Sequence, residues 1–249
     1  MSLLVFMHAA TEGPAVLGRV LMDHGHALRF VRLYAGEQVP LDLAEVEGIL
    51  SLGGPMNVDE AAAYPWLPAE MAYLQQAHQA GVPMVGICLG AQLLGAALGG
   101  EVRAMAGPAE VGWLPVRQSF AGSTDPLLAG VPWNAVQFHL HGQEVAKLPA
   151  GVIPGAVVLA SSPACPVQAF RVGLTTYGFQ YHFEWDQRDL AQVVQDPFVT
   201  QAGHSARELL DALPRYYGLY RHLGDRVCAN IAELLFPRTS VAVTAHPAG

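Results

Sequence analysis

The stretch Gly81–Gly100 reads GVPMVGICLGAQLLGAALGG and decides the fold. It carries no charged residue and nearly reaches the length of a membrane span, yet Pro83, Gln92 and six glycines interrupt it. A strand buried on both faces, followed by a buried helix, explains the missing charge better than a span does. We therefore expect a strand over Val82–Ile87 and a helix over Leu89–Leu98.

Outward from this stretch, strands and helices alternate through the first hundred residues. Apolar runs predict strands at Leu3–Phe6, Leu28–Leu33 and Gly48–Leu52, with one helix opening after Thr11–Pro14 and another ending at Gly81. Alternation of this kind is typical of an α/β protein with a parallel, helix-covered sheet. Beyond Gly100 few helical patterns separate the apolar runs, which predicts added or antiparallel strands at Trp113–Val116, Ala135–Leu140, Val157–Ala160, Val167–Val172 and Gly178–Phe183.

The C-terminal part returns to a helical pattern. Its apolar stripe has spacings of four and three and consists of Leu219, Leu223, Val227, Ile231 and Leu234. Pro237 ends the pattern. We expect one domain over residues 1–236, in which 186–236 form a helical extension, and a flexible tail over 237–249.

Composition excludes several classes of protein. The 249 residues include 13 Lys+Arg against 21 Asp+Glu, a formal charge of −8 without a basic cluster, which argues against nucleic acid or an anionic membrane as partner. The apolar share of 52% is ample for a buried core. Three cysteines with no CxxC motif indicate free thiols in a reducing compartment, and with no signal core at the N-terminus we expect a cytoplasmic protein.

The strongest site signal is the G-x-C-x-G motif around Cys88, where the predicted strand meets the predicted helix. A sharp strand-to-helix turn lifts one side chain clear of the sheet, and its glycines avoid clashes in the turn. The thiol then lies at a helix N-terminus, whose positive dipole end favours the thiolate. The N–H of Leu89 points to where an oxyanion would form. Cys165 and Cys228 lack these features and fit small buried residues.

A cysteine nucleophile needs a base, and His182-Phe183-Glu184 offers one. On a strand, residues two apart share a face, so Glu184 can hold the imidazole of His182 and fix its tautomer. A surface H-x-E pair is a frequent accident. Here, however, Gln180, His182 and Glu184 form a polar row opposite an aromatic face, which suits a site at the end of a strand.

Two further segments are weaker signals. Gly53-Gly54 after a buried strand lets backbone N–H groups approach a ligand, although an ordinary turn explains the pair as well. His139 and His141 could be combined with His182 and Glu184 as a zinc site, but no ligand pair has a standard spacing. We expect neither metal nor cofactor.

With these residues in view, the chain resembles class I, triad-type glutamine amidotransferases, and most closely stand-alone relatives of the glutaminase domain of GMP synthetase. The matching stretches cover most of the chain from Gly48 to Glu184: LSLGGPMNVDE, YPWL, VGICLGAQLLGAALGG, EVGW, HLHGQEVAKLP, LASSPACPVQAFRVG and YGFQYHFE. The resemblance implies a flavodoxin-like, mostly parallel sheet with helices on both faces. It also implies a triad of Cys88, His182 and Glu184, and an oxyanion hole from the backbone of Gly54 and Leu89.

The same resemblance suggests that Gln92 and the backbone around His141 and Gly142 hold the substrate L-glutamine. The chain departs from the family at Phe183, where Pro is usual, and at Gln143, where the GMP-synthetase branch has Asp. The second departure puts a role in GMP synthesis in doubt.

Three functions remain open at this stage. The first is a glutamine amidotransferase that passes ammonia to a separate synthase or acceptor subunit, and the second is a hydrolase of larger γ-glutamyl amides. The third is a catalytically silent binding or regulatory subunit. Glycines permit the oxyanion-loop conformation without enforcing it, so we expect the isolated protein to hydrolyse free glutamine slowly or to prefer a γ-glutamyl amide. The stand-alone alternative is a loop held ready by Pro55 and Met56-Asn57-Val58, with full activity without a partner.

Overall fold

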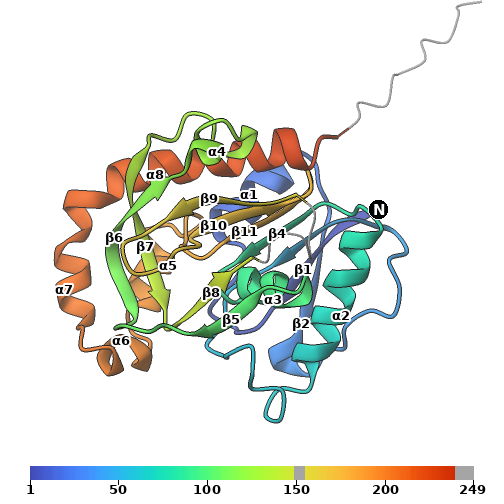
Figure 1. Cartoon of the computed structure of the whole chain (residues 1–249), viewed down its shortest axis with the longest axis horizontal. Coiled ribbons are helices and arrows are strands. Elements are labelled where there is room, and N and C mark those ends of the chain that lie inside the picture. The colour runs from blue at the N-terminus through green and yellow to red at the C-terminus, as the bar shows by residue number, and fades with distance from the viewer. Residues whose placement is uncertain (149–154, 239–249) are drawn as a thin grey trace, which may run out of the picture.

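The central feature of the molecule is a nine-stranded mixed sheet, seen in a computed structural model that describes residues 1–148 and 155–238 (Figure 1). Five neighbouring strands run parallel: β2 (Leu28–Arg32), β1 (Ser2–Met7), β3 (Val46–Ser51), β4 (Met84–Ile87) and β11 (Thr176–Phe179). Four antiparallel strands continue the sheet from β11: β10 (Ala169–Val172), β9 (Ala156–Ser161), β6 (Glu110–Gln118) and β7 (Asn134–His141). The predicted α/β class and the antiparallel addition beyond Gly100 are therefore confirmed.

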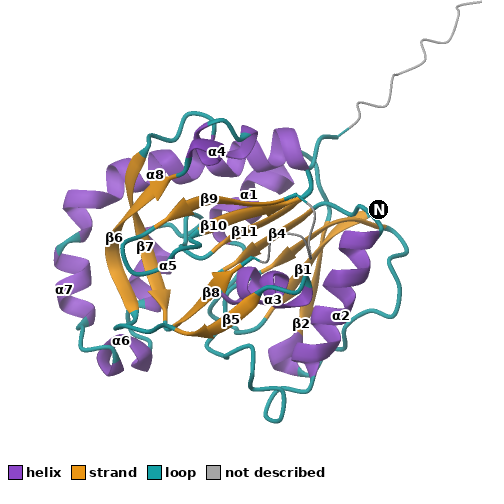
Figure 2. Ribbon diagram, in the orientation of Figure 1, coloured by secondary structure: helices purple, strands orange, loops and turns teal. Residues whose placement is uncertain are grey.

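Helices cover both faces of this sheet, as Figure 2 shows. Helix α1 (Ala15–Asp23) and α8 (Leu213–Asn230), which a π-helical turn (Ile231–Leu235) extends, contribute to one core cluster. Helices α2 (Trp66–Gln79) and α3 (Leu89–Ala97) contribute to a second cluster. Because successive strand side chains point to opposite faces, Leu3 and Val5 of β1 join the first cluster while Leu4 and Phe6 join the second.

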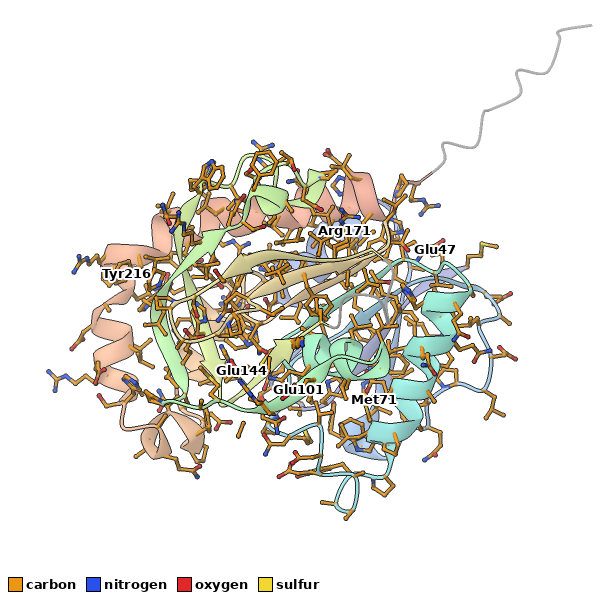
Figure 3. The ribbon with its side chains drawn as sticks, in the orientation of Figure 1. Glu47, Met71, Glu101, Glu144, Arg171 and Tyr216 are labelled. Atoms are coloured by element: carbon orange, nitrogen blue, oxygen red, sulfur yellow. The ribbon has the colours of Figure 1, made fainter. Side chains whose placement is uncertain are left out.

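Shorter elements complete the chain. A two-stranded sheet pairs β5 (Glu101–Ala104) with β8 (Gln143–Lys147). Three short helices, α5 (Gln187–Val193), α6 (Pro197–Gln201) and α7 (Ala206–Asp211), precede α8 and pack with it against β6 and β7. Single turns of helix are α4 (Phe120–Ser123) and the 3-10 segments Leu33–Ala35 and Pro126–Leu128. Figure 3 shows side chains filling the layers between these elements and the sheet.

The stretch that decides the fold behaves as predicted. β4 and α3 occupy it, and β4 lies between β3 and β11 in the parallel half of the sheet. Among the described residues, no helix combines the length and apolarity needed to cross a membrane.

Two expectations need correction. The last strand ends at Phe179, so His182 and Glu184 lie on irregular backbone beyond β11 rather than on a strand. The C-terminal stripe is buried only at its middle, because Leu219 and Leu234 are 59% and 53% exposed. Tyr220, Cys228 and Leu235 are buried in their place, because the buried face of the helix is rotated relative to the stripe predicted from the sequence. Most of the predicted tail, from residue 239, lies outside the described residues.

Candidate active site

The candidate active site lies at the carboxyl ends of four neighbouring parallel strands. His8 follows β1, Gly53 and Gly54 follow β3, Cys88 follows β4, and His182 lies beyond β11. The carboxyl edge of a parallel sheet is where open α/β folds place their ligands. The topology thus gathers segments from four distant parts of the chain.

Cys88 lies on a strained turn between β4 and α3. Its φ of 53° and ψ of −110° are values that non-glycine residues rarely adopt. A side chain at Gly86 would meet the backbone of Gly90, and a side chain at Gly90 would meet the backbone of Ser51. Both glycines are therefore required by close packing around the turn, as the G-x-C-x-G motif predicts.

Cys88 opens into a cavity of about 100 Å³, called the Cys88 pocket below. All eight residues predicted from the sequence meet in this region. Six of them line the pocket, Leu89 begins α3 directly after Cys88, and Glu184 contacts the imidazole of His182. The predicted residues among its walls are Gly54, Cys88, Gln92, His141, Gly142 and His182.

His182 is held from three sides. Its Nδ1 lies 2.7 Å from Oε1 of Glu184, and its backbone N–H donates to the carbonyl of Phe138 on β7 at 2.9 Å. The indole of Trp185 stacks on the imidazole, with ring centroids 3.4 Å apart. These contacts fix the ring although no regular strand carries it.

The charge of His182 follows from its neighbours. Burial alone lowers the pKa of His182, but the Glu184 carboxylate and the Cys88 thiol outweigh burial and raise it to about 10. The imidazole is therefore protonated at neutral pH and can donate a proton. Burial raises the pKa of both Cys165 and Cys228 to about 12.

The glycine loop after β3 is braced by a buried pair that sequence reasoning missed. Nδ1 of His8 lies 3.0 Å from the carbonyl of Leu52 and 3.1 Å from that of Gly53. Nε2 of His8 lies 2.8 Å from Glu70, whose other oxygen accepts from the hydroxyl of Ser51 at 2.7 Å. Burial lowers the pKa of His8, but Glu70 outweighs burial and raises it. Both ring nitrogens face oxygen acceptors, and an imidazole donates from both only when it is protonated.

Gln143 connects several of the segments that line the Cys88 pocket. Its backbone carbonyl accepts from the amide of Gln92 at 3.1 Å and from Nδ1 of His141 at 2.9 Å. Its side chain accepts from the N–H of Val58 and donates to Asp59. The residue that departs from the GMP-synthetase branch thus ties the segment after Pro55 to β8.

Four other residues of the site were not singled out from the sequence. Glu12, Asp196 and Phe198 line the Cys88 pocket, and Trp185 stacks on His182. Burial raises the pKa of Glu12, although the nearby His182 opposes this shift. Only Trp185 had a local signal, since it directly follows the predicted Glu184; the others come from loops brought in by the tertiary fold.

The fold and the site together define a class of protein. The molecule has a nine-stranded sheet in an α/β fold, and a cysteine lies on a strained turn at the carboxyl edge of that sheet. The family model "Glutamine amidotransferase class-I" matches residues 15–201. The chain therefore belongs to the class I glutamine amidotransferase family.

Individual relatives agree with this assignment. The chain is 32% identical to the glutamine amidotransferase-like protein YfeJ of Salmonella typhimurium, over 92% of this chain and 87% of that protein. It is 39% identical to a GMP synthase of Leifsonia xyli over 62% of this chain, but spans only 29% of that enzyme. A glutamine amidotransferase structure from Methylobacillus flagellatus superposes with a TM-score of 0.79 at 26% identity, covering 92% of this chain and 93% of that one.

Proposed function

We propose that the protein hydrolyses the side-chain amide of L-glutamine and releases ammonia. The sulfur of Cys88 attacks the amide carbon, and the N–H groups of Leu89 and Gly54 stabilise the oxyanion. The C–N bond breaks as His182 gives its proton to the departing ammonia, which leaves a γ-glutamyl thioester. His182 then takes a proton from water, whose oxygen displaces the sulfur and releases glutamate, while Glu184 orients the imidazole.

One observation carries this proposal. Cys88, held in a strained conformation at the head of α3, shares its pocket with an imidazole whose far nitrogen lies 2.7 Å from Glu184. A silent binding subunit has no need of that arrangement. The bracing of the glycine loop by His8 further supports activity without a partner, because it supplies within this chain the support that the glycines lack.

The test is ammonia release from L-glutamine by the purified full-length protein, with Cys88→Ala as the inactive reference. Labelling of Cys88 by a glutamine-like chloroketone, blocked by excess glutamine, would add direct evidence for attack by the thiol. Absence of both ammonia release and labelling would overturn the proposal and favour the silent subunit.

A second candidate, hydrolysis of larger γ-glutamyl amides, rests on a hollow beside the Cys88 pocket. This hollow, of about 260 Å³, shares Glu12, Leu140 and Asp196 with the pocket, so a leaving group larger than ammonia has space next to the reacting atoms. A panel of γ-glutamyl amides assayed against glutamine separates the two: higher kcat/KM on an extended amide favours the second candidate.

Whether the ammonia reaches an acceptor is a separate question. The name of the Leifsonia relative, a GMP synthase, suggests a separate synthase subunit as partner for this chain. An acceptor subunit that raises glutamine turnover when added would support such a complex, whereas full activity alone would indicate a self-sufficient hydrolase.

A further inference from the structure

Three buried ionisable side chains meet between β6 and β7, beside the Cys88 pocket, whose wall includes one of them, His141. Glu110 begins β6, while His139 and His141 lie at the end of β7, and the strand register pairs Glu110 directly with His141. The three side chains are at most 6% exposed. One potential ligand atom from each lies within 4.8 Å of those of the other two.

Hydrogen bonding assigns the protons of His141. Its Nδ1 lies 2.9 Å from the carbonyl of Gln143, which can only accept, so Nδ1 carries the hydrogen. In the neutral ring Nε2 is then a bare acceptor, yet it lies 3.1 Å from a carboxylate oxygen of Glu110. Two acceptors that close repel one another unless a proton or a metal cation lies between them.

His139 has the opposite problem. Neither of its ring nitrogens has a hydrogen-bond partner, although the side chain is fully buried and Nδ1 lies 3.7 Å from Glu110. Buried polar groups without partners are rare in native proteins and call for an explanation.

Glu110 is oriented by groups behind it. Its Oε1 accepts from the hydroxyl of Ser162 at 2.6 Å, and its Oε2 accepts from the amide of Gln168. Such partners behind a carboxylate, like the carbonyl behind His141, are typical of the outer shell of a metal site.

We propose that Glu110, His139 and His141 bind one Zn²⁺ ion in a buried site. Two imidazole nitrogens and one carboxylate oxygen form a donor set that suits zinc, and water or a neighbouring side chain would complete four-fold coordination. The ion relieves the repulsion at His141 and gives His139 a partner. It also fixes the end of β7 beside Gly142 and Gln143 of the Cys88 pocket.

The experiment measures metal in the full-length protein purified without chelator. We expect about one zinc per chain, loss of thermal stability on removal by a strong chelator, and recovery on adding Zn²⁺. Co²⁺ added to the stripped protein should give visible d–d absorption typical of a site with nitrogen and oxygen ligands. His139→Asn and Glu110→Gln should weaken Zn²⁺ binding at least tenfold, whereas His222→Asn, a change at an exposed histidine, should not.

Absence of zinc in the purified protein, with no cobalt spectrum and no stabilisation by Zn²⁺, would overturn the proposal. Binding that both cluster variants retain would overturn it as well, because the metal would then lie elsewhere. If His139→Asn fails to fold, the cobalt spectrum of the unmodified chain and the near-isosteric Glu110→Gln decide. None of these outcomes depends on glutamine hydrolysis.

Discussion

Two buried histidine–glutamate pairs lie at the same edge of the sheet but occupy different places in the site. His182–Glu184 lines the Cys88 pocket, whereas His8–Glu70 lies behind the glycine loop and forms its hydrogen bonds to the loop carbonyls and to Ser51. In both pairs a carboxylate raises the pKa of the imidazole against the effect of burial. The difference teaches that position decides the role: the first pair can move protons to a substrate, and the second can only hold backbone.

The largest expected effect comes from removing the reacting groups themselves. Cys88→Ala and His182→Ala should each lower kcat for glutamine by about 10⁴-fold or more, because the nucleophile and its proton carrier act as a unit. Steady-state ammonia release measures this. Cys228→Ala, at a buried cysteine outside the pocket, is the control and should keep near-normal kcat. Normal turnover in Cys88→Ala would contradict the mechanism.

We expect a smaller loss of kcat when only Glu184, the residue that orients His182, is changed. Glu184→Gln should lower kcat by about 10²- to 10⁴-fold and leave a measurable remnant, since the glutamate orients His182 without touching substrate. Circular dichroism checks that the variant is folded. If its loss equals that of His182→Ala in a folded protein, Glu184 does more than orient.

Thiol chemistry provides the next contrast. With their pKa near 12, Cys165 and Cys228 are thiolate at only about one part in 10⁴ at pH 8, and both are buried. Iodoacetamide should therefore modify Cys88 first, as peptide mass spectrometry of the native protein can show. Modification of all three at similar rates would remove the distinction between Cys88 and the other two cysteines.

The bracing pair should show a moderate effect. His8→Ala frees the carbonyls of Leu52 and Gly53, and we expect kcat to fall about 10- to 100-fold as the oriented loop becomes a minor population. His26→Ala is the matched control, because His26 also contacts a glutamate, Glu47, but braces no loop at the pocket. Equal losses in kcat would show that His8 acts through general stability alone.

The smallest effect is on stability against pH. The pKa of His182 is about 10 in the folded protein, above the value near 6.5 of an unfolded histidine, so the folded state holds the proton more tightly. Its contribution is fully present below pH 6.5 and is lost as pH rises toward 10. The melting temperature should therefore fall by a few degrees over this window, and by less in His182→Gln. An equal fall in both would assign the decline to other groups.

The sequence by itself determined the elements with strong local signals. Apolar periodicity placed β1, β3, β4 and α3, and the glycines around Cys88 predicted the turn whose strain the structure shows. The pairing of His182 with Glu184 also came from sequence, although not from a strand, because β11 ends at Phe179. Local patterns sufficed in these cases, since the residues that interact are close in the chain.

Only the tertiary structure decided which distant residues surround the pocket. His8 and Glu70 are 62 positions apart, and Glu110, His139 and Ser162 meet only because β6 pairs with β7 and the loop after β9 folds over them. Contacts of this kind leave no periodic trace, because each partner has the sequence neighbours of an ordinary loop or strand. The local chemistry of Cys88 could thus be read from one stretch, whereas the groups that hold its surroundings depend on how the parallel and antiparallel halves of the sheet are joined.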